Sequence, residues 1–224
     1  QEYSIHRKYG ISLSKVLSKY PKYINFNVVL QFMKNLLLAI DSIHQSGLAH
    51  LDLKPDNILL KNRFTYGNGI FDNLDFVIVD FGAARKFSTD RSKVLNEQMA
   101  SAAFSPPELL KRKYGKKSDI WAYGVICYLV CIRKAFLKAK AQNTFMGKCL
   151  DNISKNINIS INNLLNNSIP KYLKTTTNKK QYMKSLKKGN FHYLEDYFKK
   201  IFHTDINLRP NSIQLLNSKL YNMI

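Results

Sequence analysis

Cysteine is scarce in this sequence, and its scarcity excludes a disulfide-bonded framework. The 224 residues include three cysteines, Cys127, Cys131 and Cys149. Cys127 and Cys131 lie four positions apart in an apolar run, without the second pair or the neighbouring His that a zinc site needs. We therefore expect free, buried thiols and an intracellular protein, cytoplasmic or nuclear, in which thiols stay reduced.

Long hydrophobic runs are also missing. The longest candidate, Ile120 to Ile132, has 13 residues, whereas a membrane-spanning helix needs about 18. This run predicts a buried helix, and no membrane partner is expected. No signal peptide is evident at the start. Because the chain opens with Gln1 in place of Met, we expect it to be a fragment of a longer protein.

Acidic residues are few, and the charge is strongly one-sided. Asp and Glu number 15 against 35 Lys and Arg, which gives a formal net charge of +20. Lys supplies 28 of the basic residues and Arg, the usual reader of bases and phosphates, only seven. Lys, Asn and Ile together make 70 of the 224 residues, a bias that codons rich in A and T would produce. We therefore predict no dedicated nucleic-acid binding.

The remaining composition favours a folded domain rich in helices. Hydrophobic residues make 45% and aromatic residues 12% of the chain, enough for a sizeable core. Apolar residues recur at helical spacing or in long runs in several segments, and two short apolar segments predict a hairpin with a long loop. The expected helices are a small one before residue 18, then 26–45, 119–132, 135–153 and two within 193–220. The expected strands are 58–60 and 76–79.

Residues 156–190 are rich in Asn, Lys, Ser and Thr and are interpreted as a flexible insertion. No internal repeat is evident, and the whole chain, 1–224, is treated as one domain. The fold class expected from the pattern is mainly α with a short β-hairpin.

Two loops joined by the predicted hairpin carry the candidate chemistry. The first holds Asp52, Lys54 and Asn57, and the second begins at Asp80. Carboxylate and carboxamide oxygens from the two loops make a hard-oxygen site suited to Mg²⁺. Asp52 would then orient a hydroxyl, while Lys54 would neutralise charge on a phosphoryl group in transfer. Phosphoryl transfer depends on this kind of positioning and electrostatics.

These residues stand in the sequences His-Leu-Asp-Leu-Lys-Pro-Asp-Asn (50–57) and Asp-Phe-Gly (80–82), and the chain resembles the C-terminal lobe of a eukaryotic-type protein kinase. The resemblance implies that Asp52 orients the substrate hydroxyl and that Asn57 and Asp80 bind Mg²⁺. Lys54 is the form found in serine/threonine kinases. ATP and a protein substrate would be the reactants.

Three further motifs follow in the order that the kinase family has. Met99 to Glu108 resembles the segment that ends in Ala-Pro-Glu, and it places Ser101 where a threonine bridges Asp52 and Lys54. The segment 119–124 resembles the start of the central helix, whose Asp119 steadies the catalytic loop. The resemblance also implies a buried ion pair between Glu108 and Arg209.

The nucleotide site and the histidines complete the expected roles. The resemblance places Leu59 and Val79 against the adenine ring, and Glu2 and Ser4 in the hinge. His50 is expected to pack on Phe81 and not to act as a base. The other four histidines, His6, His44, His192 and His203, show no constellation and are assigned no role.

Two departures from the family pattern matter. Leu51 replaces the arginine that grips a phosphate on the activation loop, so Ser88, Thr89 and Ser92 are weak candidates for control by phosphorylation. The glycine-rich loop, the strand lysine and the helix glutamate of the N-terminal lobe are missing from residues 1–224. We therefore expect the isolated chain, a C-terminal lobe from the hinge onward, to be inactive.

Two functions remain open. In the first, the chain is a piece of an active Ser/Thr kinase whose N-terminal lobe lies upstream, which the intact Asp52, Lys54, Asn57 and Asp80 favour. In the second, a lobe without catalysis serves as a binding module or decoy inhibitor. Its partner would then be another kinase, a separate N-terminal lobe or a further protein.

Overall fold

The structure is a computed structural model, and it describes seven segments of the chain. These segments are residues 10–19, 26–61, 75–87, 93–94, 104–108, 112–132 and 191–221. The predicted hinge residues Glu2 and Ser4, the predicted bridging Ser101, the helix expected at 135–153 and the insertion expected at 156–190 all lie outside the described residues.

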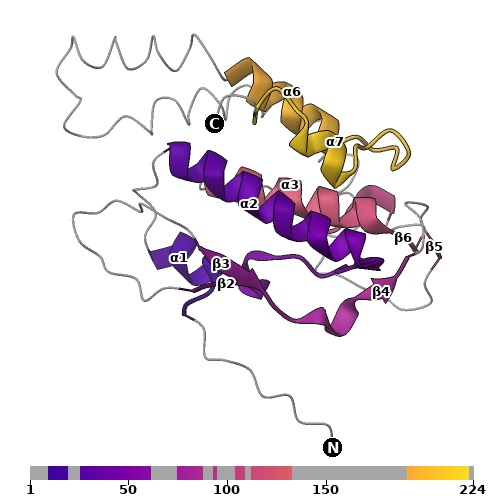
Figure 1. Cartoon of the computed structure of the whole chain (residues 1–224), viewed down its shortest axis with the longest axis horizontal. Helices are drawn as coiled ribbons and strands as arrows, with labels where there is room; N and C mark the ends of the chain where they lie inside the picture. The colour runs from indigo at the N-terminus through magenta and orange to yellow at the C-terminus, as the bar shows by residue number, and fades with distance from the viewer. Residues whose placement is uncertain are drawn as a thin grey trace, which may run out of the picture.

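Two long helices form the centre of the molecule. α2 spans Phe26–Gln45 and α3 spans Lys116–Ile132. α6 (Phe191–Ile201) packs on α3, and α7 (Ser212–Leu216) packs on α2. The short α1 (Leu13–Lys19) contacts the hairpin on the other side of the central pair. Figure 1 shows α2 and α3 between the α6–α7 pair and the hairpin.

The spacing of apolar residues explains which faces are buried. In α2, Val29, Met33, Leu36 and Ile40 recur at intervals of three and four and are all buried. In α3, by contrast, every side chain from Ser118 to Tyr128 is buried, as expected for a helix enclosed by others. Gly124 allows one close approach, because a Cβ at this position would clash with the side chain of Ile201 on α6.

Three tyrosines from separate elements meet inside this core. The hydroxyl of Tyr123 on α3 lies 2.8 Å from those of both Tyr197 and Tyr221, which are 2.9 Å from each other. Tyr123 Oη also donates to the carbonyl of Met33 on α2 at 3.2 Å. The tyrosine cluster therefore links α2, α3, α6 and the residues after α7 through polar contacts in an apolar core.

The predicted hairpin is present and carries the loops of interest. β2 (Ile58–Leu60) pairs antiparallel with β3 (Phe76–Ile78), with Ile58 opposite Ile78. Ile58 and Leu60 face the core, and Leu59 points to the other side, as strand alternation requires. Residues 10–12 run beside β2, since Gly10 N donates to Leu60 O at 2.9 Å.

Two further strand pairs lie at one end of the molecule. β1 (Leu48–Ala49) pairs with β4 (Arg85–Lys86), and β5 (Lys93–Val94) pairs with β6 (Lys113–Tyr114). A second, small hydrophobic cluster of Ala49, Leu51, Phe87 and Tyr114 joins β1, β4 and β6. The end formed by β4, β5 and β6 is visible opposite α1 in Figure 1.

The described elements agree closely with those expected from the sequence. The helix predicted at 26–45 and the strand at 58–60 are confirmed with the same bounds, and the strand at 76–79 ends one residue earlier. The helix predicted at 119–132 begins at Lys116, where the Ser118 hydroxyl accepts from Gly115 N at 3.2 Å and supports the first turn. Within the described residues, no helix has the length and apolarity to cross a membrane.

Candidate active site

Asp52 lies in the loop between β1 and β2, held by two neighbours. Lys54 Nζ donates to Asp52 Oδ2 at 2.6 Å, and Asn57 Nδ2 lies 3.2 Å from the same oxygen. Asn57 Nδ2 also donates to the backbone carbonyl of Asp52 at 2.8 Å. A three-residue 3₁₀ turn, Pro55–Asn57, closes this loop and makes the contact possible. The loop therefore fixes the orientation of the Asp52 carboxylate.

The hairpin brings Asp80 to this loop. Val79 N donates to Asn57 O at 3.0 Å, which places the residue after Val79 beside the end of the loop. Asp80 has a left-handed backbone with φ 65° and ψ 71°, and its side chain is exposed. Its Oδ1 accepts a long hydrogen bond from Gly82 N, at 3.4 Å. The predicted meeting of the two loops is thus present in the structure.

These two residues fit a hard cation by their donor chemistry. Asn57 uses its amide nitrogen on Asp52, so its amide oxygen is the atom that could serve as a cation ligand. The Asp80 carboxylate lies on the exposed side of the same hairpin end. Among the described residues, no group of three or more His, Cys, Asp or Glu is placed to hold a metal. A cation here would thus take few protein ligands, as Mg²⁺ does when a phosphate supplies the rest.

His50 connects the two loops structurally. Its ring packs on Phe81 with centroids 4.8 Å apart, which confirms the predicted contact. Its Nε2 lies 3.1 Å from Val79 O, and its Nδ1 lies 3.3 Å from Asp52 N. Since both ring nitrogens contact the backbone and the residue is buried, its geometry is that of a support and not of a base.

Asp119 fixes the backbone at the start of the loop that carries Asp52. Its two oxygens accept hydrogen bonds from the backbone N–H groups of His50 and Leu51, both at 2.8 Å. Leu51 has φ 65°, a left-handed conformation that is strained for a residue other than glycine. Asp119, at the start of α3, therefore holds a strained turn directly before Asp52, and the predicted role of Asp119 is confirmed.

His44 is a functional neighbour that the sequence analysis missed. Assigning it no role was wrong, because its Nε2 lies 2.9 Å from Asp119 Oδ2 in a buried contact. His44 stands in the last turn of α2, 75 residues away in sequence. The sequence offered one signal for this contact, a polar residue on the side of α2 that otherwise carries apolar residues.

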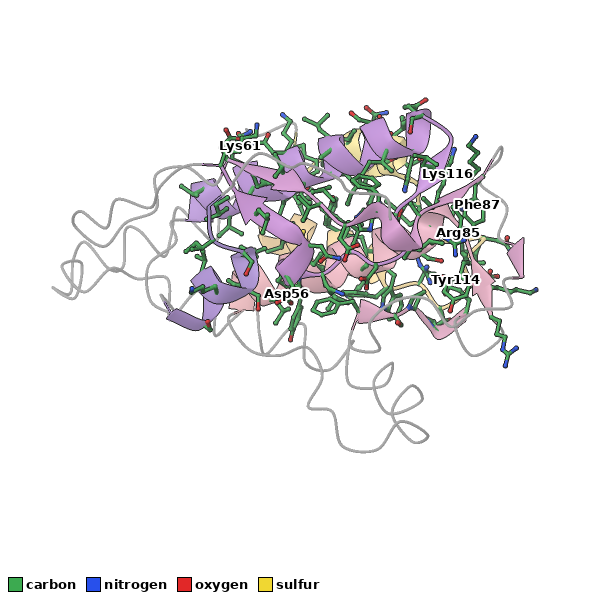
Figure 2. The ribbon with its side chains drawn as sticks, turned by 90° about the horizontal axis from the view of Figure 1, so that it is seen from below. Asp56, Lys61, Arg85, Phe87, Tyr114 and Lys116 are labelled. Carbon is green, nitrogen blue, oxygen red and sulfur yellow. The ribbon has the colours of Figure 1, made fainter. Side chains whose placement is uncertain are left out.

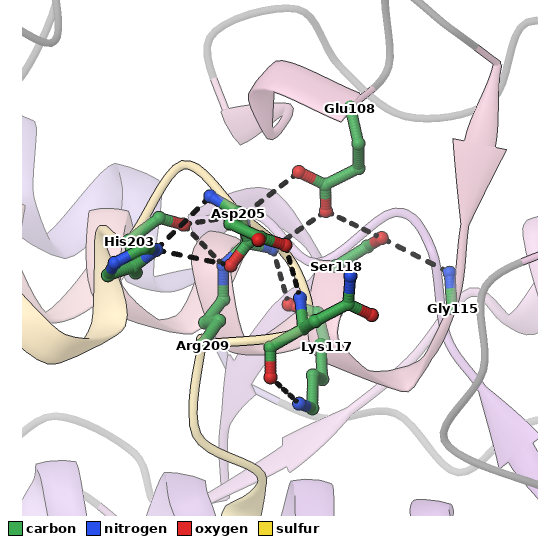
Figure 3. Close-up of polar contacts among 8 residues, drawn as sticks. Glu108, Gly115, Lys117, Ser118, His203, Asp205 and Arg209 are labelled. Carbon is green, nitrogen blue, oxygen red and sulfur yellow. Dashed lines mark hydrogen bonds and ion pairs between the residues drawn. The ribbon is translucent and has the colours of Figure 1, made fainter.

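Glu108 and Arg209 form the predicted buried ion pair (Figure 3). Arg209 Nη1 and Nη2 donate to Glu108 Oε1 and Oε2 at 2.7 and 2.8 Å. Arg209 also donates to the backbone carbonyls of Lys117 and His203, and its guanidinium stacks 5.0 Å from the Trp121 ring centroid. Two charges in this position are compensated by a bidentate contact and several hydrogen bonds. The pair ties the segment before α3 to the one before α7.

Leu59 and Val79 lie where an adenine-facing surface was predicted. They share a face of the hairpin, because Leu59 pairs with Val77 and Val79 follows two residues later. Both are partly buried and lie near Asn57 and Asp80. Their contact with a nucleotide remains a prediction, as does any role of Glu2, Ser4 and Ser101.

The site's parts match one known family along almost the whole sequence. The sequence model described as "Protein kinase domain" matches residues 5–221. The chain belongs to the protein kinase family. The match supports the family resemblance, but it does not confirm the finer expectation that the chain is only the C-terminal lobe.

Two curated relatives are calcium-dependent protein kinases of plants. The chain is 32% identical over 130 residues to calcium/calmodulin-dependent serine/threonine-protein kinase 1 of Oryza sativa subsp. japonica, which covers 58% of this chain and 20% of the relative. It is 32% identical over 107 residues to calcium-dependent protein kinase 27 of Arabidopsis thaliana, 47% of this chain and 20% of that one. The match thus spans about a fifth of each relative's length.

A solved structure shows the same fold. The chain is similar to a chain of the yeast RNA Pol II CTD kinase CTDK-1 complex, with a TM-score of 0.67 over 96% of this chain and 69% of that one. Sequence identity in this match is 21%, so it shows the protein kinase fold alone.

Proposed function

We propose that the chain carries the catalytic loop of an ATP-dependent Ser/Thr protein kinase, which transfers the γ-phosphoryl group of ATP to a protein Ser or Thr hydroxyl. The observation that carries this proposal is the contact set of Asp52: Lys54 and Asn57 both bind its Oδ2, and Asn57 is in turn tied to the backbone before Asp80. Asp52, Lys54 and Asn57 are thus held together by their side chains, and a backbone hydrogen bond brings Asp80 to the same end of the hairpin.

In this proposal each residue has one task. Asp52 accepts a hydrogen bond from the substrate hydroxyl and orients its oxygen for in-line attack. Lys54, which already pairs with Asp52 at 2.6 Å, balances negative charge beside the transferred group. Asn57 and Asp80 would hold Mg²⁺, which when bound neutralises charge on the phosphates.

The remaining contacts keep this constellation in place. His50 fixes the distance between the two loops through Val79 and Phe81. Asp119 holds the strained backbone at Leu51, so the side chain of Asp52 emerges at a defined angle. Such support for reactive groups is what positioning catalysis requires, because small displacements of a reacting group are costly.

We also keep the C-terminal-lobe assignment as part of this proposal. The support is the order of the motifs: the proposed catalytic loop begins at residue 50, and the described residues before it form helices α1 and α2, the two-residue strand β1 and a segment that runs beside β2. Activity, substrates and partners are therefore to be tested on the full-length gene product. The adenine-facing roles of Leu59 and Val79, the hinge roles of Glu2 and Ser4 and the bridging role of Ser101 belong to the same proposal.

The test is Asp52→Asn in the full-length protein, assayed with labelled ATP, Mg²⁺ and protein substrates. We expect turnover to fall about a hundredfold or more while the protein stays folded, because the variant keeps the shape of the side chain and loses the carboxylate. Asp75→Asn, which alters an exposed carboxylate on the hairpin, is the matched control and should leave turnover within twofold.

Two outcomes would contradict the proposal. Equal turnover in the Asp52→Asn variant and the wild type would remove Asp52 from the chemistry. A folded wild-type protein with no turnover on any Ser or Thr substrate would favour the binding-module function. In that case, capture of another kinase or of a separate N-terminal lobe would be the activity to measure.

A further inference from the structure

Basic side chains gather at the end of the molecule that β4, β6 and the start of α3 form. We call the surface made by Arg85, Lys86, Arg112, Lys113 and Lys116 the basic surface. Lys86, Arg112 and Lys113 are exposed, while Arg85 and Lys116 are partly buried. Figure 2 shows Arg85 and Lys116 at the same end as Phe87 and Tyr114.

The second hydrophobic cluster explains why these residues meet. Phe87 and Tyr114, each 1% exposed, pack in one cluster although they are far apart in sequence. Strand alternation then turns their neighbours Lys86 and Lys113 outward. The packing of Phe87 and Tyr114 therefore determines where Lys86 and Lys113 lie on the surface.

The segments that form this surface are rich in basic side chains. Residues 85–87 and 112–118 hold six basic and no acidic side chains. Glu108 and Asp119, in the adjoining described segments, are buried and bind inward, to Arg209 and to the backbone before Asp52, whereas Asp80, five residues before Arg85, is exposed. Within the described residues, this surface therefore carries an excess of basic side chains, of which Lys86, Arg112 and Lys113 are exposed.

The basic surface also lies close to the candidate active site. Leu51, a member of the cluster beneath the basic surface, directly precedes Asp52. β4 begins five residues after Asp80. A polypeptide that presents its hydroxyl to Asp52 therefore has flanking residues within reach of these cations.

We propose that the basic surface binds an acidic segment of the protein substrate, next to the hydroxyl that is phosphorylated. The inference rests on the proposed kinase function and adds the substrate's chemical class. Several clustered cations attract and orient an acidic partner together, although each exposed pair alone is weak. The guanidinium of Arg112 adds a fork suited to carboxylate or phosphate.

An acidic polypeptide fits this surface better than a nucleic acid does. Single-stranded nucleic acids bind where exposed aromatic rings stack on the bases. The aromatic side chains of the cluster beneath this surface, Phe87 and Tyr114, are buried, and the exposed ring of Phe81, four residues before Arg85, already packs on His50. The surface therefore offers charge without stacking platforms.

The test compares two serine peptides of equal length in the full-length protein. One has Asp and Glu around the serine, and the other has Asn and Gln at the same positions. In Arg112→Ala/Lys113→Ala, we expect the ratio of kcat/KM for the acidic peptide over the neutral one to fall about fivefold. The neutral peptide should keep its kcat/KM within twofold. Lys199→Ala/Lys200→Ala, which removes two exposed cations from α6, is the matched control and should leave the ratio unchanged.

A binding assay keeps this inference separate from the proposed function. The acidic peptide with Ala in place of Ser, labelled for fluorescence anisotropy, should bind the Arg112→Ala/Lys113→Ala variant about fivefold more weakly than wild type. Weaker binding by this variant, with no phosphorylation by the wild type, would support peptide binding by the basic surface and contradict the proposed kinase function.

Phosphorylation with the same peptide preference in wild type and variant would overturn peptide binding by the basic surface and leave the kinase function standing. A single-stranded oligonucleotide that binds more tightly than the peptide, and is lost in the variant, would overturn the acidic-peptide assignment.

Discussion

His44 Nε2 lies 2.9 Å from Asp119 Oδ2, in a buried contact that joins the end of α2 to the start of α3. The same carboxylate receives the backbone N–H groups that precede Asp52. A helix end, a strained turn and a candidate catalytic carboxylate are therefore linked through one buried group. A substitution at His44 should therefore alter the position of Asp52 through Asp119.

We predict that His44→Ala destabilises the fold by about 1–3 kcal/mol, because it removes a partner from a buried carboxylate. Turnover of the full-length protein should fall as well, through loosening of the loop at Leu51. Chemical denaturation and steady-state kinetics measure the two effects. His44→Gln, which keeps an N–H donor, should recover part of both. His203→Ala is the control, since the ring contacts of His203 are exposed.

A second prediction concerns the ion pair of Glu108 and Arg209, whose side chains are 6% and 0% exposed. Arg209→Ala should cost about 3–5 kcal/mol, because it leaves a buried carboxylate without its charge partner. Glu108→Ala and the double variant complete a cycle by urea denaturation, and the double variant should cost less than the sum of the single ones.

An exposed ion pair of this chain provides the control for that cycle. Lys61 and Asp75 lie 3.3 Å apart on the hairpin, with side chains 45% and 46% exposed. Lys61→Ala should cost less than about 1 kcal/mol, because solvent screens such a pair. A cost for Arg209→Ala as small as this would contradict the structural importance assigned to the buried pair.

Local patterns explain why much of the fold was predictable from the sequence. The spacing of apolar residues in α2 follows the face that packs on the core, so the bounds of this helix were predicted correctly. The hairpin follows from two apolar segments, and the contacts among Asp52, Lys54 and Asn57 join residues at most five positions apart. Interactions of this range are set mainly by the loop itself.

Long-range contacts explain what was missed. His44 and Asp119 are 75 positions apart, and Tyr123 and Tyr221 are 98 apart. The pairing of polar residues on buried faces depends on how the helices pack against each other. A short sequence pattern does not contain this information. The strand pairs β1–β4 and β5–β6 have only two residues a side, too few for an alternation to be recognised.

The cluster around Leu51 gives a third prediction, about control by phosphorylation. Leu51 is packed against an apolar surface of Ala49, Phe87 and Tyr114, at the position where an arginine would receive a phosphate. Replacing Ser88, Thr89 and Ser92 together by Ala should therefore leave turnover of the full-length protein within a few-fold. Leu51→Arg should lower the melting temperature, since it would bury an unpaired charge.

A large loss of turnover in the triple Ala variant would contradict this prediction. It would mean that another cation, with Arg85 on β4 as the first candidate, receives the phosphate. Arg85→Ala in the wild-type background separates the two explanations, because it should then reproduce the loss.

The tyrosine cluster yields a prediction for alkaline pH. Burial is the main cause that raises the pKa of Tyr123 and of Tyr197 well above the usual value of about 10, and the neighbouring Cys127 and Tyr221 raise both pKa values further. In the unfolded chain these tyrosines would lose their protons near pH 10, whereas in the folded chain they would keep them. Above that pH the unfolded state therefore binds fewer protons, and stability falls as pH rises.

We expect the melting temperature of this chain to fall between about pH 9.5 and 11 more steeply in wild type than in Tyr123→Phe/Tyr197→Phe. Phenylalanine cannot ionise, so the variant loses the two raised pKa values and with them part of the pH dependence. It should also be less stable at pH 7.5, because the polar contacts with Tyr221 and Met33 are gone. Tyr193→Phe, on the same helix as Tyr197, is the control and should keep the wild-type slope. Parallel curves for wild type and the double variant would show that the folded tyrosines ionise as readily as unfolded ones. That result would contradict the raised pKa values of the buried cluster.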